Sequence, residues 1–64
     1  MTIKLTVPGM ACSACATNIT NAVKAIDTNA TVEADPKTKL VNVDTQVSET
    51  AIKEALVAAG YPPA

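Results

Sequence analysis

The chemistry open to this chain is that of two thiols, because Cys12 and Cys15 are its two cysteines and it has no histidine. A helical pattern begins at Ser13, so we expect Cys12 on a loop and Cys15 in a first helical turn. Unpaired amides and the positive end of the helix dipole stabilise a thiolate at such a place. The thiolate is the form that binds metal, so the pair predicts a metal site with two outward-facing sulfurs.

Length and composition limit the classes of function that this chain can serve. Its 64 residues suffice for one small domain over residues 1–64. A net charge of −1 and a single aromatic residue exclude the basic, stacking surface of a nucleic-acid-binding protein. The sequence shows neither a signal peptide nor a run of about 18 apolar residues, so we expect no membrane insertion. Unpaired cysteines persist in reducing compartments, and we therefore expect a cytoplasmic protein.

Alternating apolar and polar residues predict three strands, and apolar residues at spacings of three and four predict two helices. The strands span residues 2–7, 30–34 and 39–44, and the last two form a hairpin around a turn at residues 35–38. The first helix spans residues 13–26. Its expected apolar stripe comprises Cys15, Ile19, Ala22, Val23 and Ile26.

The second helix carries clear signals at both of its ends. Ser48 is a good N-cap, and Val47 and Ile52 occupy the two positions of a hydrophobic staple. After the helix, Gly60 supplies a residue for the left-handed conformation, and Pro62 prevents continuation. The expected buried stripe comprises Ile52, Ala55, Leu56 and Ala59.

The order of these elements predicts an α+β fold of the ferredoxin-like type. In this βαββαβ arrangement, two helices cover one face of a mainly antiparallel sheet. Residues 61–64 leave room only for a fourth strand that is short or absent. Because Ile, Val, Leu and Ala fill the core without Phe or Trp, we expect modest stability that metal binding raises.

The cysteine segment resembles a known family signature. Residues 9–15, GMACSAC, resemble the Gly-Met-x-Cys-x-x-Cys motif of the heavy-metal-associated domain family, and residues 58–61, AAGY, resemble the stretch after that family's second helix. The resemblance covers essentially the whole chain and is strongest to small bacterial copper chaperones. It implies that Cys12 and Cys15 carry Cu(I). It also implies delivery to the amino-terminal metal-binding domain of a copper-transporting P-type ATPase.

Two features depart from the family pattern. The fourth strand is clipped to a few residues with two prolines, which puts the edge of the sheet in doubt. The loop position that carries lysine in eukaryotic chaperones is Tyr61 here, which points to a bacterial chaperone or to a domain of an ATPase. Met1 and the compact length favour the free protein.

The residues themselves also favour a soft metal. A structural zinc site requires four Cys or His ligands, whereas this chain offers two thiolates. Cu(I) is soft and accepts two or three ligands, so that a partner's thiolate can enter and one original sulfur can then leave. Hg(II) and Zn(II) stay open as alternative cargoes. Thiol-disulfide exchange also stays open, because a Cys-x-x-Cys pair at a helix start is a redox motif too. We expect a metal carrier and not an enzyme.

Three residues near the cysteines are expected to hold the site in place without binding the metal. We interpret Met10 as a hydrophobic plug that holds the loop against the core, in preference to a thioether ligand. Tyr61 is expected to pack on the second helix and to shield or hydrogen-bond the thiolates. Ser13 is expected to cap the first helix. Thr6 and Thr45 are expected at the surface.

A partner is expected to dock at the end of the fold that holds the cysteines. The residues expected around the site are Ala11, Ala14, Thr17, Asn18, Asn21, Tyr61 and Pro62. This docking face is nearly uncharged, since Lys37 and Lys39 are expected on the hairpin turn. We therefore expect a transient complex, held mainly by the shared metal, with a weak dependence on salt. The same exposed thiols can also bridge copper between two copies of the chain.

Overall fold

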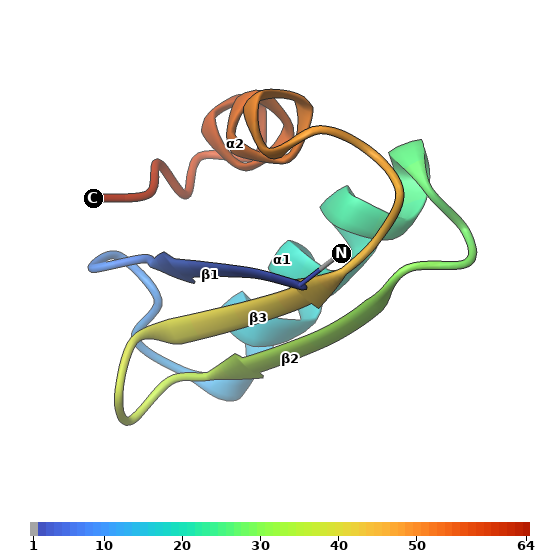
Figure 1. Cartoon of the computed structure of the whole chain (residues 1–64). Helices are drawn as coiled ribbons and strands as arrows, with labels where there is room; N and C mark the ends of the chain where they lie inside the picture. Colours follow the sequence, from blue (N-terminus) through green and yellow to red (C-terminus); the bar gives the residue numbers. More distant parts are fainter. Residues whose placement is uncertain (1) are drawn as a thin grey trace.

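Three strands and two helices follow one another in the predicted order in a computed structural model that describes residues 2–64. The elements are β1 (Thr2–Thr6), α1 (Ser13–Ile26), β2 (Thr31–Asp35), β3 (Leu40–Asp44) and α2 (Glu49–Ala58). Both helices lie on one face of the sheet (Figure 1). This is the predicted ferredoxin-like α+β arrangement. Val7, Ala30 and Lys39, which we predicted as strand ends, lie just outside the three strands.

The sheet is antiparallel, and its strand order is β1-β3-β2. Its register aligns the apolar residues of the three strands in two rows on the face that the helices cover. One row joins Ile3, Val43 and Val32, and the next joins Leu5, Val41 and Ala34. Side chains alternate between the faces of a strand, so this register buries one face and leaves the other to solvent.

The side chains in the middle of the apolar stripe of α1 are the ones that are buried in the core. Ile19 and Val23 are fully buried, and Cys15 is half-buried nearer the start of the helix. Ile26, which we expected in the same stripe, is 46% exposed. It is the last helical residue, and the chain leaves it in an extended conformation at Asp27, so the stripe ends before the helix does.

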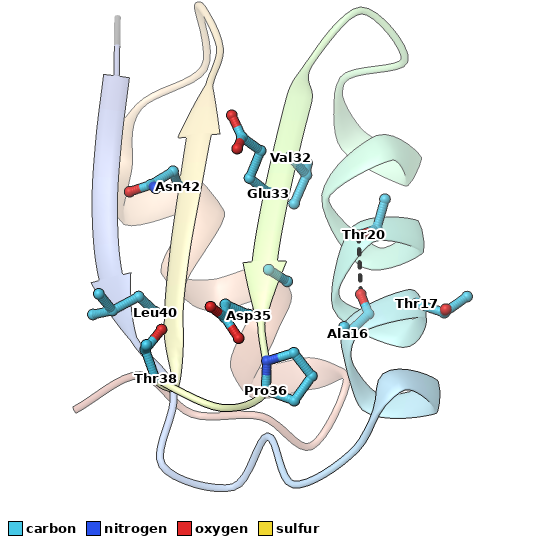
Figure 2. A pocket seen from close by; sticks show the side chains of 11 residues that line it. Ala16, Thr17, Thr20, Val32, Glu33, Asp35, Pro36, Thr38, Leu40 and Asn42 are labelled. Atoms are coloured by element: carbon cyan, nitrogen blue, oxygen red, sulfur yellow. Dashed lines mark hydrogen bonds between the residues drawn. The ribbon is translucent and has the colours of Figure 1, made fainter.

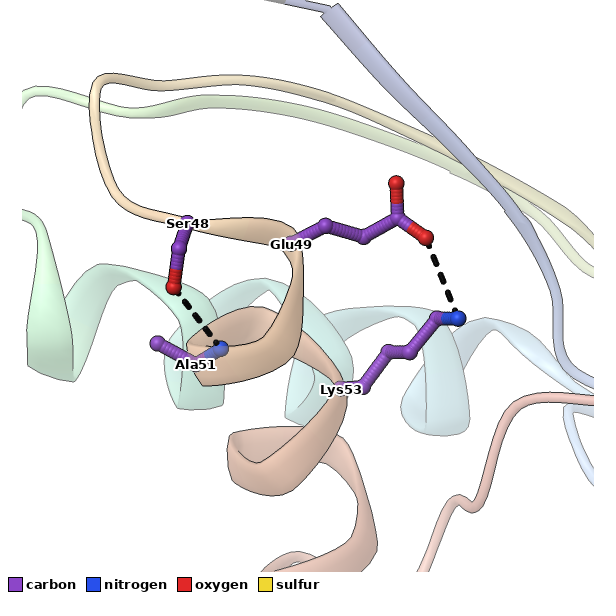
Figure 3. Close-up of polar contacts among 4 residues, drawn as sticks. All are labelled: Ser48, Glu49, Ala51 and Lys53. Carbon is purple, nitrogen blue, oxygen red and sulfur yellow. Dashed lines mark hydrogen bonds and ion pairs between the residues drawn. The ribbon is translucent and has the colours of Figure 1, made fainter.

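Helix α2 begins as the sequence predicts. The Ser48 hydroxyl accepts a hydrogen bond from the amide of Ala51 at 3.3 Å, and this satisfies one amide of the first turn (Figure 3). Glu49 and Lys53 form an exposed ion pair at 3.0 Å one turn apart on the same helix (Figure 3). No helix within residues 2–64 has the length and apolar character needed to cross a membrane.

The end of α2 is closed by a Schellman motif. Gly60 adopts a left-handed conformation with a φ of 91°, and its amide donates to the carbonyl of Val57 at 3.0 Å. The amide of Tyr61 donates to the carbonyl of Leu56 at 2.8 Å, which turns Tyr61 back toward the core. Ala59 is exposed, against our expectation, because the helix ends there and the stripe stops at Leu56.

The fourth strand is reduced to a single backbone contact. Residues 61–64 form no strand, but the amide of Ala64 donates to the carbonyl of Thr6 at 2.7 Å. The C-terminus therefore lies beside the end of β1 (Figure 1). This confirms the expectation of a short or absent strand at this edge of the sheet.

Thr45 is buried, so the expectation of a surface residue was wrong. Its side chain is 4% exposed, its hydroxyl donates to the carboxylate of Asp27 at 2.5 Å, and the same oxygen accepts from the amide of Val47 at 3.1 Å. The residue continues the inward alternation of Val41 and Val43 just past the end of β3. It therefore joins the end of α1 to the start of α2.

Acid sensitivity should depend on this contact. The Thr45 hydroxyl, followed by the amides of Asn29 and Gln46, lowers the pKa of Asp27 below its ordinary value of 3.8. A lowered carboxyl pKa contributes stability above the ordinary value, and the contribution is lost as pH falls through the folded-state pKa. We expect Thr45→Val to lower the melting temperature by several degrees at pH 7, because two hydrogen bonds are lost.

The difference in melting temperature between the wild type and Thr45→Val should shrink as pH falls below the ordinary carboxyl range. Thermal unfolding followed by circular dichroism can show this. Thr6→Val on the exposed face of β1 is the matched control. A deficit of equal size at pH 7 and pH 2 would show that the Asp27 contact does not contribute.

Candidate metal centre

The two cysteines lie where the β1–α1 loop enters helix α1. This loop, the β2–β3 turn and the C-terminal residues gather at one end of the molecule (Figure 1). Cys12 is the N-cap of α1 in an extended conformation, with φ −155° and ψ 171°, and Cys15 lies in the first turn. The helix has no side-chain cap. Ser13 is already helical, so the prediction that it caps the helix was wrong, because the thiol residue occupies the capping position.

The geometry brings the two thiols together at the surface. The Sγ atoms of Cys12 and Cys15 are 3.3 Å apart, which is a hydrogen-bonding distance for sulfur and far longer than a disulfide bond of about 2.05 Å. Both cysteines are free. Cys12 is exposed and Cys15 is half-buried. A reagent or an ion can therefore reach the pair from solvent, as the sequence predicted.

The sulfur separation fits a site for a thiolate-binding ion after a small adjustment. Two metal–sulfur bonds of about 2.3 Å, as in zinc sites, place their sulfurs at most about 4.6 Å apart, so the observed distance must grow by at most about 1.3 Å. Cys12 can supply this movement, since its side chain is exposed. Within residues 2–64, no group of three or more His, Cys, Asp or Glu side chains could surround an ion. The donor set offered here is thus two sulfurs.

The surroundings of Cys15 favour its thiolate. The amide of Ala11 contributes most, the Cys12 thiol and the Tyr61 hydroxyl add to it, and together they lower the pKa of Cys15 from its ordinary value of 9.0 to about 7. A much larger fraction of this thiol is therefore ionised at neutral pH than at the ordinary pKa of a cysteine. The strongest donor belongs to the loop before the helix, where the sequence had suggested only the amides of the first helical turn.

Tyr61 reaches the site from the segment that follows α2. Its hydroxyl oxygen accepts a hydrogen bond from the side-chain amide of Asn18 at 3.0 Å. An oxygen that accepts from Asn18 keeps its own proton for the Cys15 sulfur, whose pKa Tyr61 lowers. Tyr61 also packs against the core, so it combines the two roles that we predicted for it.

Removing the tyrosine hydroxyl should therefore make Cys15 less acidic. We expect Tyr61→Phe to move the pH midpoint of Cys15 alkylation upward from about 7 and to slow alkylation at pH 7, because the thiolate loses a donor. Iodoacetamide labelling across pH, with each cysteine resolved by tandem mass spectrometry, measures this. Asn21→Ala, which changes an exposed residue on α1, the helix that carries Cys15, is the control. Superimposable pH profiles for the wild type and Tyr61→Phe would contradict the assignment.

Met10 is fully buried in the hydrophobic core, with 0% of its surface exposed. This is the position expected of a plug, since the loop that precedes Cys12 is held against the core by this side chain. Its thioether is closed off from solvent, whereas the Cys12 thiol is exposed.

Lys39 is a neighbour of the site that sequence reasoning missed. Lys39 lies on the hairpin turn, as expected, but we did not expect its ammonium to reach the loop before Cys12, where it donates to the carbonyl of Met10 at 2.6 Å. The backbone marks the residue as unusual, because Lys39 has a φ of 66° and positions with a positive φ usually carry Gly or Asn. A positive φ, however, cannot be inferred from a lysine in a sequence.

The residues predicted for the docking face differ little in their exposure to solvent. Ala11, Ala14, Thr17, Asn18, Asn21 and Pro62 are exposed, and Tyr61 is half-buried. Alanine methyls and neutral polar groups thus dominate this face. Lys39 adds one half-buried positive charge behind the loop.

A separate hollow of about 700 Å³ runs along β2 and the facing side of α1 (Figure 2). Thr17 and Thr20 line it from the helix, and Glu33, Asp35 and Pro36 line it from the strand and the turn. The Thr20 hydroxyl already donates to a carbonyl of its own helix at 2.9 Å (Figure 2). Neither cysteine lines this hollow, so the thiol chemistry lies outside it.

Solved structures similar to this chain include proteins that handle metals. A variant of the copper chaperone Atx1 from Synechocystis PCC6803, in a trimeric form, is 40% identical over 97% of this chain and 98% of its own, with a TM-score of 0.94. A gold binding protein is 40% identical over 94% and 92% of the two chains, with a TM-score of 0.92. Oxidized MerP from Ralstonia metallidurans CH34 is 31% identical over 100% and 93%, with a TM-score of 0.84.

A comparison with curated protein sequences gives no match. The family model described as heavy-metal-associated domain matches residues 4–62, which is nearly the whole chain and includes both cysteines. The chain therefore belongs to the heavy-metal-associated domain family.

Proposed function

We propose that this protein is a copper chaperone in which Cys12 and Cys15 bind one Cu(I) ion as cargo. The observation that carries the proposal is the pair of thiol sulfurs, 3.3 Å apart, at the exposed start of α1. A Cys15 pKa of about 7 supports it, because a thiolate is then available at neutral pH. The similarity to a copper chaperone from Synechocystis supports Cu(I) as the cargo.

Transfer would proceed by exchange of thiolate ligands. With copper held by the two sulfurs, an incoming thiolate from a partner forms a third copper–sulfur bond. The bond to Cys12 or Cys15 then breaks, and a second thiolate of the partner displaces the remaining sulfur in the same way. The two released thiolates re-equilibrate with protons of the solvent. The oxidation state of copper does not change, and the ion is never released free. The protein thus acts as a carrier and not as an enzyme.

The partner that we propose is the amino-terminal metal-binding domain of a copper-transporting P-type ATPase, reached from the cytoplasm. The small neutral face around the thiols supports a transient complex, so the transfer rate should change little with salt. The trimeric form of the Synechocystis protein is compatible with copies of this chain that share copper, such as a copper-bridged homodimer.

Other soft ions are the second candidate cargo. A gold binding protein with 40% identity supports this, because soft ions share a preference for thiolate ligands. Hg(II) would suit the same two sulfurs, whereas Zn(II) would need further ligands, which two cysteines do not provide. Competition between these ions at the reduced site therefore belongs in the test of function.

The experiment is a titration of the reduced protein with Cu(I) in the presence of a chromogenic Cu(I) chelator. We expect one ion per chain and transfer of that ion to a purified ATPase metal-binding domain. Parallel titrations with Hg(II) and Zn(II) rank the alternatives. An insulin-reduction assay measures dithiol redox activity in the same preparation. Insulin reduction without competitive Cu(I) binding would replace the carrier proposal with a redox function.

A further inference from the structure

Lys39 occupies a backbone position at the hairpin turn that lysine rarely adopts. Its φ is 66°, the only positive φ of a non-glycine residue within residues 2–64. Its amide donates to the carbonyl of Asp35 at 2.9 Å, and this bond closes the turn between β2 and β3. Gly or Asn takes a left-handed conformation with less strain. The presence of lysine here therefore suggests that its side chain is needed.

Both ends of the short loop from Val7 to Met10 are bonded to Lys39. The amide of Val7 donates to the carbonyl of Lys39 at 2.8 Å, and the ammonium of Lys39 donates to the carbonyl of Met10 at 2.6 Å. The loop is closed on itself by the Met10 amide, which donates to the carbonyl of Val7 at 3.1 Å. One residue of the hairpin turn therefore holds the segment that leads directly into Cys12.

The contact between the ammonium and the carbonyl is well suited to hold that loop. It is charge-assisted and half-buried, and it joins residues 29 positions apart in the sequence. Within residues 2–64, no carboxylate lies within ion-pair distance of the Lys39 ammonium to compete for it. The Met10 side chain itself is fully buried in the core, so the residue is held both by its side chain and by its carbonyl.

We propose that Lys39 is the positioning residue of the metal centre, because its ammonium fixes the Met10 carbonyl and hence the direction in which Cys12 presents its sulfur. The expected effect of Lys39 on metal binding rests on the proposed function. The expected effect of Lys39 on the metal-free loop does not rest on it. Partners of this kind behind a metal ligand commonly change affinity by about 10- to 100-fold when they are lost.

The test compares two substitutions with a control on the same turn. Lys39→Asn keeps a residue that tolerates the left-handed backbone but cannot reach Met10, and Lys39→Arg retains a long cationic donor. Lys37→Asn alters an exposed lysine two residues away. For each protein we would measure Cu(I) affinity by chelator competition, thermal stability, and amide hydrogen exchange of residues 9–12 in the metal-free, reduced state.

We expect Lys39→Asn to weaken Cu(I) binding by about tenfold and to speed amide exchange in residues 9–12. Lys39→Arg should restore most of both, and Lys37→Asn should match the wild type. Unchanged loop exchange in Lys39→Asn would overturn the proposal, as would a fall in melting temperature with unaltered Cu(I) affinity. Failure of the wild type itself to bind Cu(I) would overturn the copper function, while loop exchange would still decide the role of Lys39.

Discussion

Replacing either cysteine with serine is expected to lower the Cu(I) affinity of the reduced protein by about 10²- to 10³-fold. Four-ligand zinc sites bind with about 10–16 kcal/mol, or about 2.5–4 kcal/mol for each ligand, and we expect the loss of one thiolate to remove a similar amount of binding free energy. Serine preserves the size of Cys12 or Cys15 but offers a hard, neutral oxygen to a soft ion. Chelator competition on Cys12→Ser and Cys15→Ser would measure the loss.

The matched control for the cysteine variants is Ser13→Ala, which lies between the two cysteines and contributes no side-chain cap. It should bind copper as the wild type does. The melting temperatures of Cys12→Ser and Ser13→Ala should also stay close to that of the wild type, because both side chains are exposed. Tight one-to-one binding that survived in Cys12→Ser or Cys15→Ser would locate the metal elsewhere and refute the proposed site.

Substitution of Met10 by alanine is expected to lower the stability of the fold more than Thr45→Val does. The Met10 side chain is fully buried, and truncation of such a residue to alanine destabilises a core by about 2–5 kcal/mol. Native domains are typically stable by about 0.05–0.15 kcal/mol per residue, so this loss is a large fraction of the total for 64 residues. Urea unfolding followed by circular dichroism would give the change in the free energy of unfolding.

A second variant separates the plug role of Met10 from a ligand role. Met10→Leu conserves the apolar volume, so it should cost less than about 1.5 kcal/mol of stability and leave the Cu(I) affinity intact. A thioether ligand cannot be replaced by leucine. A strong loss of copper binding in Met10→Leu, with stability preserved, would therefore show that sulfur and not volume matters at this position.

Local patterns in the sequence were sufficient for most of the fold. Alternation placed Ile3 and Leu5 on the inner face of β1, and Ser48 and Gly60 marked the ends of α2, because these signals act over a few residues. The patterns were less reliable at element ends. Ile26 and Ala59 have the spacing of buried helical residues, but they lie at the ends of the two helices and are exposed.

The alternation of inward and outward side chains continues past the end of β3. Thr45 lies on the inward side by the same alternation that buried Val41 and Val43, yet its polar side chain suggested the surface. The carboxylate of Asp27 satisfies the buried hydroxyl, and that partner lies 18 residues away in the sequence. A hydroxyl can be buried only when such a partner is present, which no local pattern reports.

The sequence by itself determined that two thiols would meet at the start of a helix, because their spacing and the break before the helix are local properties of residues 9–15. Only the tertiary structure decided what surrounds those thiols. Lys39 meets Met10 across 29 positions, and Asn18 meets Tyr61 across 43. Such contacts depend on how the strands pair and how the helices pack over them, so they follow from the folded chain as a whole.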